Sequence, residues 1–367
     1  MSEVADLNRA DIAGELLRRQ RARESLAEYS LSIDIPGVPN AALDEEEEAE
    51  DVTLGSADDD TLIVAHGAGR LKNRFELKPI TYSPIETRMA IHQIIMMDRI
   101  QKCIETDRGR CMIFAPPGST KSTTGSVIGA SWAMGRKRNQ QIILASYATG
   151  IAAKQSRKVR AIARDPRYTA IWASKPTLRD DQRAVDDWSM SNGSSLFAAG
   201  LLAGITGNRA DGLIIDDPVA NREQADSPTI REKTYNEYLD TAMTRAKPKM
   251  WCLLIQTRWH EEDLAGSILP EYYEGESGMI HCRDGQIWDV LCIPAEAEKE
   301  NDVLGRKKGE FLWPEWFPRA HWTTWRDNPR GKRTWSALYQ QRPAPLSGVH
   351  FNREGFEFFN PDLPRYG

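Results

Sequence analysis

Long hydrophobic runs are missing from this chain of 367 residues, although 40% of its residues are hydrophobic. No apolar run reaches the roughly 18 residues that a transmembrane helix needs, and the mean hydropathy is −0.54. No signal-peptide pattern opens the chain. These absences exclude helical membrane spans, and the length allows one large α/β domain or two smaller ones.

Cysteine is scarce as well, with five widely spaced residues and no C-x-x-C pair. This excludes a disulfide scaffold and a structural zinc site, and it predicts a reducing cytoplasmic environment. The chain also lacks a G-x-S-x-G elbow and a G-x-G-x-x-G fingerprint. Esterase-type hydrolases and dehydrogenases therefore have no support in the sequence.

Positive net charge is absent, since the formal net charge is −5. Ten acidic residues and no Lys or Arg lie between Asp44 and Asp60, and without those ten the chain would carry +5. Blocks of like charge are usually solvated, so we interpret residues 44–60 as an acidic linker. A DNA mimic that shields a basic surface is the alternative.

Helical spacing of apolar residues is present near the N-terminus and again over Pro84–Cys103. The first pattern predicts one or two amphipathic helices and rests on Leu7, Ile12, Leu16, Leu17, Leu26 and Tyr29. Beyond it, short apolar runs occur at Cys111–Phe114, Gln141–Ala145, Gly212–Ile215 and Met250–Ile255. Because these runs do not alternate, they predict buried strands of a parallel sheet covered by helices.

A Trp-, Pro- and Arg-rich stretch follows from about residue 280. We interpret it as a small C-terminal subdomain wrapped on the first domain. Its tryptophans are expected in the core or at an interface rather than as base-stacking platforms.

A phosphate-binding loop is predicted directly after the strand Cys111–Phe114. It runs Ala115-Pro116-Pro117-Gly118-Ser119-Thr120-Lys121-Ser122-Thr123, and a helix follows to about Met134. Loop amides and a helix N-terminus bind phosphate, Lys121 supplies a positive charge, and the Ser122 hydroxyl is suited to Mg2+. Ala115 and Thr120 replace the glycines of G-x-x-x-x-G-K-[ST], so a plain turn with a surface lysine stays open.

Two further strand ends carry polar residues. Asp216 and Asp217 follow one strand, where Asp216 is expected to hold Mg2+-bound water and Asp217 to be the general base. Thr257 and its neighbours follow another strand, where they are suited to sense a γ-phosphate. The alternative for the acid pair is a strand-end turn, because Asp-Pro favours turns.

Taken together, these segments resemble the large terminase subunit of tailed bacteriophages, a DNA-packaging motor. The resemblance spans about residues 90–350 and rests on Ala115-Pro116-Pro117-x-x-x-Lys121-Ser122, Ile142–Tyr147, Gly204–Pro218, Thr257–Leu264, Ile293–Ala295 and Leu338–Pro343. It implies an α/β fold of the ASCE-type P-loop NTPases, a mostly parallel central sheet flanked by helices, with ATP and Mg2+ as cofactors.

The resemblance also implies roles for individual residues. Asp216 corresponds to the Walker B acid and Asp217 to the catalytic acid, where the family often has Glu, and Thr257 falls in the motif that couples hydrolysis to movement. Ser122 and Asp216 are the implied metal-binding residues. The implied nucleotide-binding residues are Gln93, Pro117, Gly118, Ser119, Thr120, Lys121, Ser122 and Thr123.

For several residues and segments, the sequence is consistent with two different roles. Arg209 is a candidate arginine finger acting on a neighbouring subunit, or it pairs with Asp211 or Asp216 of its own chain; Arg258 is the second finger candidate.

His92 and Gln93 contact adenine or belong to an ordinary helix surface. The basic stretch Lys154–Arg160, with Arg164 and Arg167, is a DNA-tracking surface or a solvated helix face. The acids after His260 are expected at a helix N-terminus rather than in a metal cluster.

The resulting domain prediction is an N-terminal helical segment (1–43), the acidic linker (44–60), a P-loop ATPase domain (61–280), a small linker subdomain (281–350) and the start of a connection to an absent nuclease domain (351–367). The implied function is an ATP-driven motor subunit that translocates double-stranded DNA into a procapsid, without nuclease activity. Its implied partners are the portal protein, the small terminase subunit and further copies in a ring, a pentamer by resemblance. Its implied location is the host cytoplasm and, transiently, the portal vertex, without a membrane. A weak nucleotide-binding docking module and a helicase-like remodeller are the alternatives.

Overall fold

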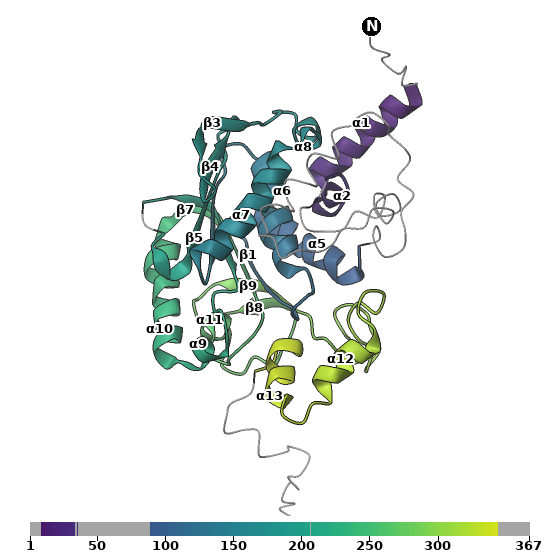
Figure 1. Cartoon of the computed structure of the whole chain (residues 1–367), viewed down its shortest axis with the longest axis vertical. Helices are drawn as coiled ribbons and strands as arrows, with labels where there is room; N and C mark the ends of the chain where they lie inside the picture. Colours follow the sequence, from purple (N-terminus) through teal and green to yellow (C-terminus); the bar gives the residue numbers. More distant parts are fainter. Residues whose placement is uncertain (1–8, 34, 36–88, 206, 344–367) are drawn as a thin grey trace, which may run out of the picture.

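A nine-stranded sheet in the order β3-β4-β5-β2-β6-β7-β1-β9-β8 forms the centre of the molecule (Figure 1). The computed structural model describes residues 9–33, 35, 89–205 and 207–343; the predicted acidic linker and the segment 351–367 lie outside these ranges. The strands are β1 (Arg110–Phe114), β2 (Gln141–Ser146), β3 (Leu178–Arg183), β4 (Asp187–Met190), β5 (Ser195–Gly200), β6 (Ala210–Asp216), β7 (Ala246–Gln256), β8 (Gly278–His281) and β9 (Ile287–Cys292).

The middle of the sheet is parallel. Every neighbouring pair from β5 to β9 runs parallel, and antiparallel pairing is confined to β3-β4-β5 at one end and β8-β9 at the other. The predicted fold class, a mostly parallel α/β sheet flanked by helices, is confirmed. The four predicted strands correspond to β1, β2, β6 and β7, and β7 lies between β1 and β6. The carboxyl ends of these four strands therefore meet at one edge.

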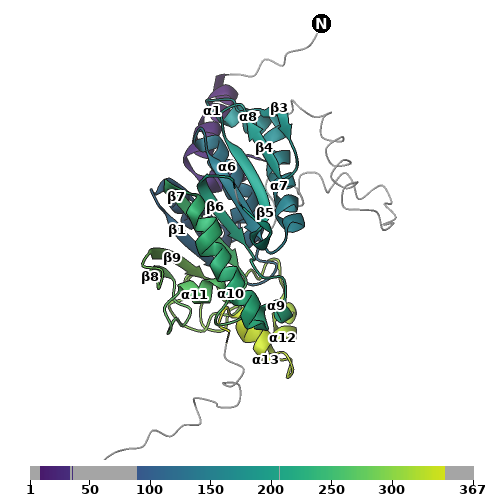
Figure 2. The ribbon, with the colours of Figure 1, turned by 90° about the vertical axis from the view of Figure 1, so that its left-hand side faces the viewer.

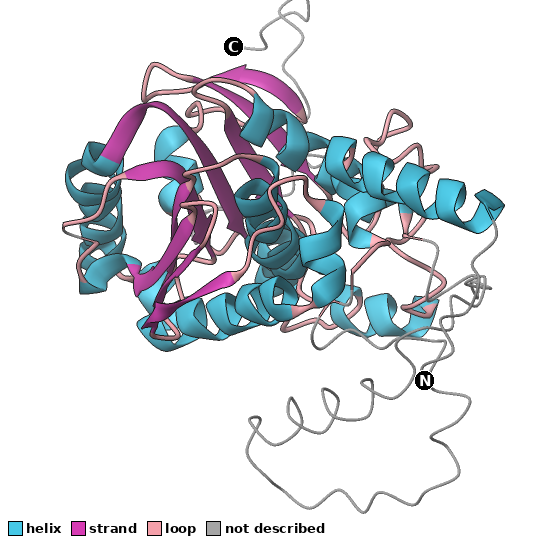
Figure 3. Cartoon of the chain, turned by 90° about the horizontal axis from the view of Figure 1, so that it is seen from above, coloured by secondary structure: helices cyan, strands magenta, loops and turns pink. Residues whose placement is uncertain are grey.

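Helices cover both faces of the sheet, as the views from the side and from above show (Figures 2 and 3). One apolar layer contains residues of the first helices and of α5, α6, α7 and α8, and the other contains residues of α11 and of Glu237–Ala242. The helices are α1 (Arg9–Glu24), α2 (Leu26–Ser30), α5 (Ile91–Glu105), α6 (Ala130–Arg136), α7 (Thr149–Arg164), α8 (Pro166–Ile171), α9 (Arg222–Asp226), α10 (Pro228–Asn236), α11 (Leu264–Ile268), α12 (Arg319–Arg326) and α13 (Lys332–Thr334). Within the described ranges, none of these is long and apolar enough to span a bilayer.

The two predicted N-terminal helices are present as α1 and α2. Tyr29 is fully buried and donates a hydrogen bond from its hydroxyl to Ser131 Oγ at 2.9 Å. The expected apolar stripe is wrong for Leu16 and Leu17, which are 58% and 48% exposed. Among residues 13–24 of α1, for which burial is described, Ala22 alone is buried, and it lies near the C-terminal end of the helix, where the indole of Trp132 donates to the Ala22 carbonyl at 3.2 Å.

The sheet continues past residue 280, where the sequence places the limit of the ATPase domain. β9 pairs with β1 over Cys111–Phe114, so this later strand is integral to the sheet. The remaining C-terminal segment carries α12 and α13. Its tryptophans differ in burial: Trp322 is fully buried as expected, Trp313 and Trp335 are partly buried against the core, and Trp316 and Trp325 are 48% and 41% exposed.

Candidate nucleotide site

The predicted phosphate loop connects β1 to a helix that begins at Lys121 and passes through a π-helical segment, Thr123–Gly129, into α6. The helix lies directly against β7, because a Cβ at Gly125 would meet Ile255 Cδ1 at 2.1 Å. Pro117 and Gly118 are exposed, whereas Ser119 is buried. The arrangement of strand, loop and helix is the one that the sequence predicts.

Thr120 adopts a left-handed backbone conformation, with φ at 64°. This conformation is unfavourable for a β-branched residue, and glycine is the residue that usually accepts it. The Thr120 hydroxyl accepts a hydrogen bond from Gln93 Nε2 at 3.0 Å, while Gln93 Oε1 accepts one from the Ala90 amide at 2.9 Å. Gln93 therefore joins the start of α5 to the phosphate loop.

Lys121, Ser122 and the two acids come together as predicted. Ser122 Oγ donates to Asp216 Oδ1 at 2.8 Å, and Lys121 Nζ lies 3.6 Å from Asp217 Oδ2. Ser126, which the sequence does not single out, donates to Asp216 Oδ2 at 2.9 Å. Its signal is its spacing, because it lies four residues after Ser122 and so on the same helix face.

Asp216 is poised for a cation. It is 3% exposed, and burial, followed by the neighbouring charge of Asp217, raises its pKa well above the usual aspartate range. A cation bound beside Asp216 would lower this pKa and favour the charged carboxylate. Hydroxyl and carboxylate oxygens are suitable ligands for Mg2+, so Ser122 and Asp216 fit the predicted metal site.

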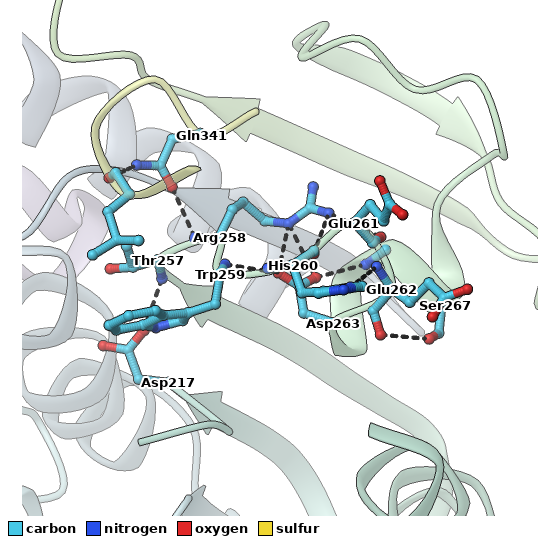
Figure 4. A network of polar contacts seen from close by, with 12 residues as sticks. Asp217, Thr257, Arg258, Trp259, His260, Glu261, Glu262, Asp263, Ser267 and Gln341 are labelled. Carbon is cyan, nitrogen blue, oxygen red and sulfur yellow. Dashed lines mark hydrogen bonds and ion pairs between the residues drawn. The ribbon is translucent and has the colours of Figure 1, made fainter. Parts of the chain in front are cut away.

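Asp217 is held by the strands on both sides of β6. Its own amide donates to the Ile255 carbonyl at 2.8 Å, and its carbonyl accepts from the Tyr147 amide at 3.2 Å. Its side-chain Oδ1 accepts from the Thr257 amide at 2.8 Å (Figure 4). Thr257 therefore acts here through its backbone, and the three predicted strand ends converge on one cluster.

A family model described as "Terminase large subunit, T4likevirus-type, N-terminal" matches residues 112–341, which include this whole cluster. The chain belongs to this family. No curated protein matches the chain.

Solved large terminases are also similar to this terminase chain. The HK97 bacteriophage large terminase is 15% identical with a TM-score of 0.45, over 70% of this chain and 51% of its own. The large terminase of the thermophilic bacteriophage D6E, solved with ATP-γ-S, is 12% identical with a TM-score of 0.31, over 53% and 44%. The same D6E protein, solved with ADP, is 14% identical with a TM-score of 0.35, over 56% of this chain and 46% of its own. The chain thus spans about half the length of these terminases.

The structure does not place either finger candidate of this terminase chain at its own nucleotide site. Arg209 is exposed just before β6, about 20 Å from Asp216 at the usual rise per strand residue. The alternative, a pairing of Arg209 with Asp211 or Asp216 of its own chain, is not seen among the described residues: Asp211 pairs with Lys247 at 2.7 Å, and Asp216 accepts from Ser122 and Ser126. A role of Arg209 on a neighbouring subunit stays a prediction.

Arg258, the second finger candidate, is engaged within its own chain. It is 4% exposed, and its Nε lies 2.9 Å from Asp263 Oδ2. Its guanidinium also lies 5.2 Å from the ring centroid of Phe114. A buried and paired arginine cannot reach a neighbouring subunit, which excludes Arg258 as the finger in this conformation.

The acids after His260 form a helix start, as predicted. Asp263 caps α11, its Oδ1 accepting from the Gly266 amide at 2.9 Å. No group of three or more metal-ligating side chains was found among the described residues. The basic stretch lies on α7 and at the start of α8, with Lys154, Arg157, Arg164 and Arg167 exposed.

His92 is fully buried, so it belongs to neither the exposed helix surface nor an open base pocket. Its ring centroid lies 5.0 Å from that of Trp313. Burial lowers the pKa of His92 to about 4. Gln93, its neighbour, is half-buried and is the residue left for an adenine contact.

We expect His92 to make the terminase chain sensitive to acid. An unfolded histidine binds a proton near pH 6.5, but the folded one does so only near pH 4, so this contribution to stability is complete above pH 6.5 and falls as the pH drops. The loss approaches about 3 kcal/mol by pH 4. Denaturant unfolding between pH 7 and pH 4 should show a flatter pH dependence for His92→Phe than for wild type; parallel curves would contradict it.

Proposed function

We propose that this chain is the ATP-hydrolysing half of a terminase motor that translocates double-stranded DNA into a procapsid. Family membership supports the motor role. The observation that carries the ATPase assignment is the contact of Ser122 with Asp216 and of Lys121 with Asp217, which joins the phosphate loop to both acids. A cation, a metal-binding pair and a carboxylate base at one sheet edge are the parts that phosphoryl transfer needs.

In this proposal each residue has a separate task. Lys121 binds the β- and γ-phosphates, while Ser122 and Asp216 hold Mg2+. The metal, when bound, neutralises charge on the phosphates. Asp217 Oδ2 accepts the proton of the water that attacks the γ-phosphate, which leaves ADP and phosphate.

The Lys121–Asp217 contact of 3.6 Å is then a resting pair. Bound phosphate competes for the lysine, which frees Asp217 Oδ2 for water. Asp217 Oδ1 stays on the Thr257 amide and fixes the direction of the free oxygen. The base is thereby activated only when nucleotide is present.

DNA and protein partners belong to the same proposal. The exposed cations of α7 and α8 supply a surface for the phosphate backbone of DNA. Binding to the backbone depends on positive charge and requires no recognition of individual bases. Arg209, far from its own Asp216, is suited to serve a neighbouring copy in a ring docked on the portal protein. The small terminase subunit completes the proposed assembly, in the host cytoplasm.

Phosphate release by the purified chain, with and without double-stranded DNA, tests the proposal. We expect Mg2+-dependent turnover that DNA stimulates. Nucleotide binding without turnover under both conditions would instead favour a docking module, for which the left-handed Thr120 is the structural argument. Unwinding of duplex DNA would favour a helicase-like remodeller.

We also expect the chain to leave DNA uncut. Two-metal cleavage needs several clustered carboxylates, and the described residues contain no group of three or more His, Cys, Asp or Glu side chains that could hold a metal ion. Supercoiled plasmid incubated with the chain and Mn2+ should stay supercoiled. Nicking that survives Asp216→Asn would reveal a second active centre.

A further inference from the structure

The segment after β7 is held by two different parts of the molecule at consecutive residues. The Thr257 amide donates to Asp217 Oδ1 at 2.8 Å, and the next amide, that of Arg258, donates to Gln341 Oε1 at 3.1 Å (Figure 4). Asp217 belongs to the nucleotide site, whereas Gln341 follows the C-terminal π-helical segment Trp335–Tyr339. One peptide unit therefore separates the proposed base from the C-terminal segment.

Gln341 is itself firmly placed. It is fully buried, its backbone φ is 57°, and its Nε2 donates to the Leu338 carbonyl. A left-handed conformation at a non-glycine residue costs about 1 kcal/mol or more, and it persists where surrounding contacts determine it. The side-chain oxygen of Gln341 is thus aimed at the Arg258 amide by contacts on both its ends.

The other end of the segment is also fixed. Asp263 binds the Arg258 guanidinium and in addition accepts from the Trp259 amide at 3.1 Å. Both members of this ion pair are buried. Residues 258–263 thus form a loop held by contacts within the loop itself. Gln341 binds the first of these residues, Arg258, and so joins the loop to the C-terminal segment.

We propose that Gln341 is a positioning residue for ATP hydrolysis. By holding the Arg258 amide it fixes the preceding peptide, and so keeps the Thr257 amide on the Asp217 carboxylate. Its side-chain partners are the Arg258 amide and the Leu338 carbonyl, and Lys121, Ser122 and Asp216 are the residues proposed to bind nucleotide and metal, so Gln341 is expected to act on kcat rather than on nucleotide binding. This inference rests on the proposed ATPase function.

Gln340 provides a matched control. It is also buried, at 3% exposure, and it makes three hydrogen bonds, but all of them go to Glu296 and Glu298 within the C-terminal segment. Gln341→Met and Gln340→Met therefore remove comparable buried amides. Only the first removes the acceptor of the Arg258 amide, and Gln341→Glu keeps an oxygen there.

The experiment combines turnover with amide-resolved hydrogen exchange. For Gln341→Met we expect about a 10-fold fall in kcat, with an unchanged KM for ATP and faster exchange at both Thr257 and Arg258. Gln340→Met should leave both readouts near wild type, and Gln341→Glu should restore most of kcat.

Equal effects of the two methionine variants, or unchanged exchange at Thr257 in Gln341→Met, would overturn the inference. Absence of turnover in the wild-type chain would overturn the proposed function instead. The exchange comparison would then still decide whether Gln341 holds the Thr257 amide.

Discussion

Replacing Lys121 by alanine should reduce ATP hydrolysis about 100-fold or more. Lys121 is buried at 7% exposure with its ammonium group 3.6 Å from Asp217, so it delivers a positive charge inside a region with little water. Charge that develops on the phosphates in the transition state would lose this compensation, and the loss of one such contact costs a few kcal/mol. Initial rates of phosphate release measure the effect.

Lys249→Ala is the control for this variant. Lys249 is exposed in the first half of β7 and pairs with Asp107 at 2.7 Å, at the sheet edge opposite the phosphate loop. Its loss removes the same charge and should leave turnover unchanged. Wild-type turnover of Lys121→Ala would move the nucleotide site elsewhere in the chain.

Asp217→Asn should abolish turnover and preserve nucleotide binding. The asparagine oxygen can still accept from the Thr257 amide, so the geometry of the strand end is kept. An amide cannot take a proton from water, and general base catalysis is typically worth 100- to 10,000-fold, on the order of magnitude. Single-turnover hydrolysis with a parallel binding titration measures the two properties separately.

Asp216→Asn should behave differently. Asp216 accepts from Ser122 and Ser126, and an asparagine in its place loses one acceptor and the charge that favours Mg2+. We expect Mg2+-dependent nucleotide affinity to fall about 10- to 100-fold along with turnover. Identical binding and turnover in the two variants would mean that both acids act as one metal site.

The strands that could be predicted are those whose buried positions include an unbroken run of apolar residues. β1, β2, β6 and β7 appear as uninterrupted apolar runs because helices cover both faces. β9 was missed because Asp289 interrupts its run; in the structure this carboxylate is 5% exposed and lies 2.5 Å from the Arg99 guanidinium of α5. A buried charge breaks the apolar run of a strand, and the partner that makes its burial possible can lie far away in the sequence. No local sequence pattern therefore predicts such a strand.

The site shows the same division. Lys121, Ser122 and the two acids carry their chemistry in their side chains, so their order along the chain predicts their meeting. Thr257 is predicted to sense the γ-phosphate from its position at a strand end, and in the structure it is the backbone amide of Thr257 that binds Asp217. Every residue type except proline has such an amide, and the acceptor Gln341 lies 83 positions from Arg258, so neither contact leaves a local trace in the sequence.

The position of β1 in the sheet also dictates when the site can exist during synthesis. Its neighbours are β7 and β9, whereas β2 pairs with β5 on one side and with β6 on the other, and these three strands can assemble once residue 216 has emerged. Folding of the phosphate-loop strand is therefore a late, non-local event. At ordinary translation speeds of about 5–20 residues per second, β1 waits on the order of ten seconds for β7. A nascent chain stalled before residue 246 would accordingly present both edges of β1 unpaired and bind no nucleotide, which makes nucleotide binding a reporter of completed folding.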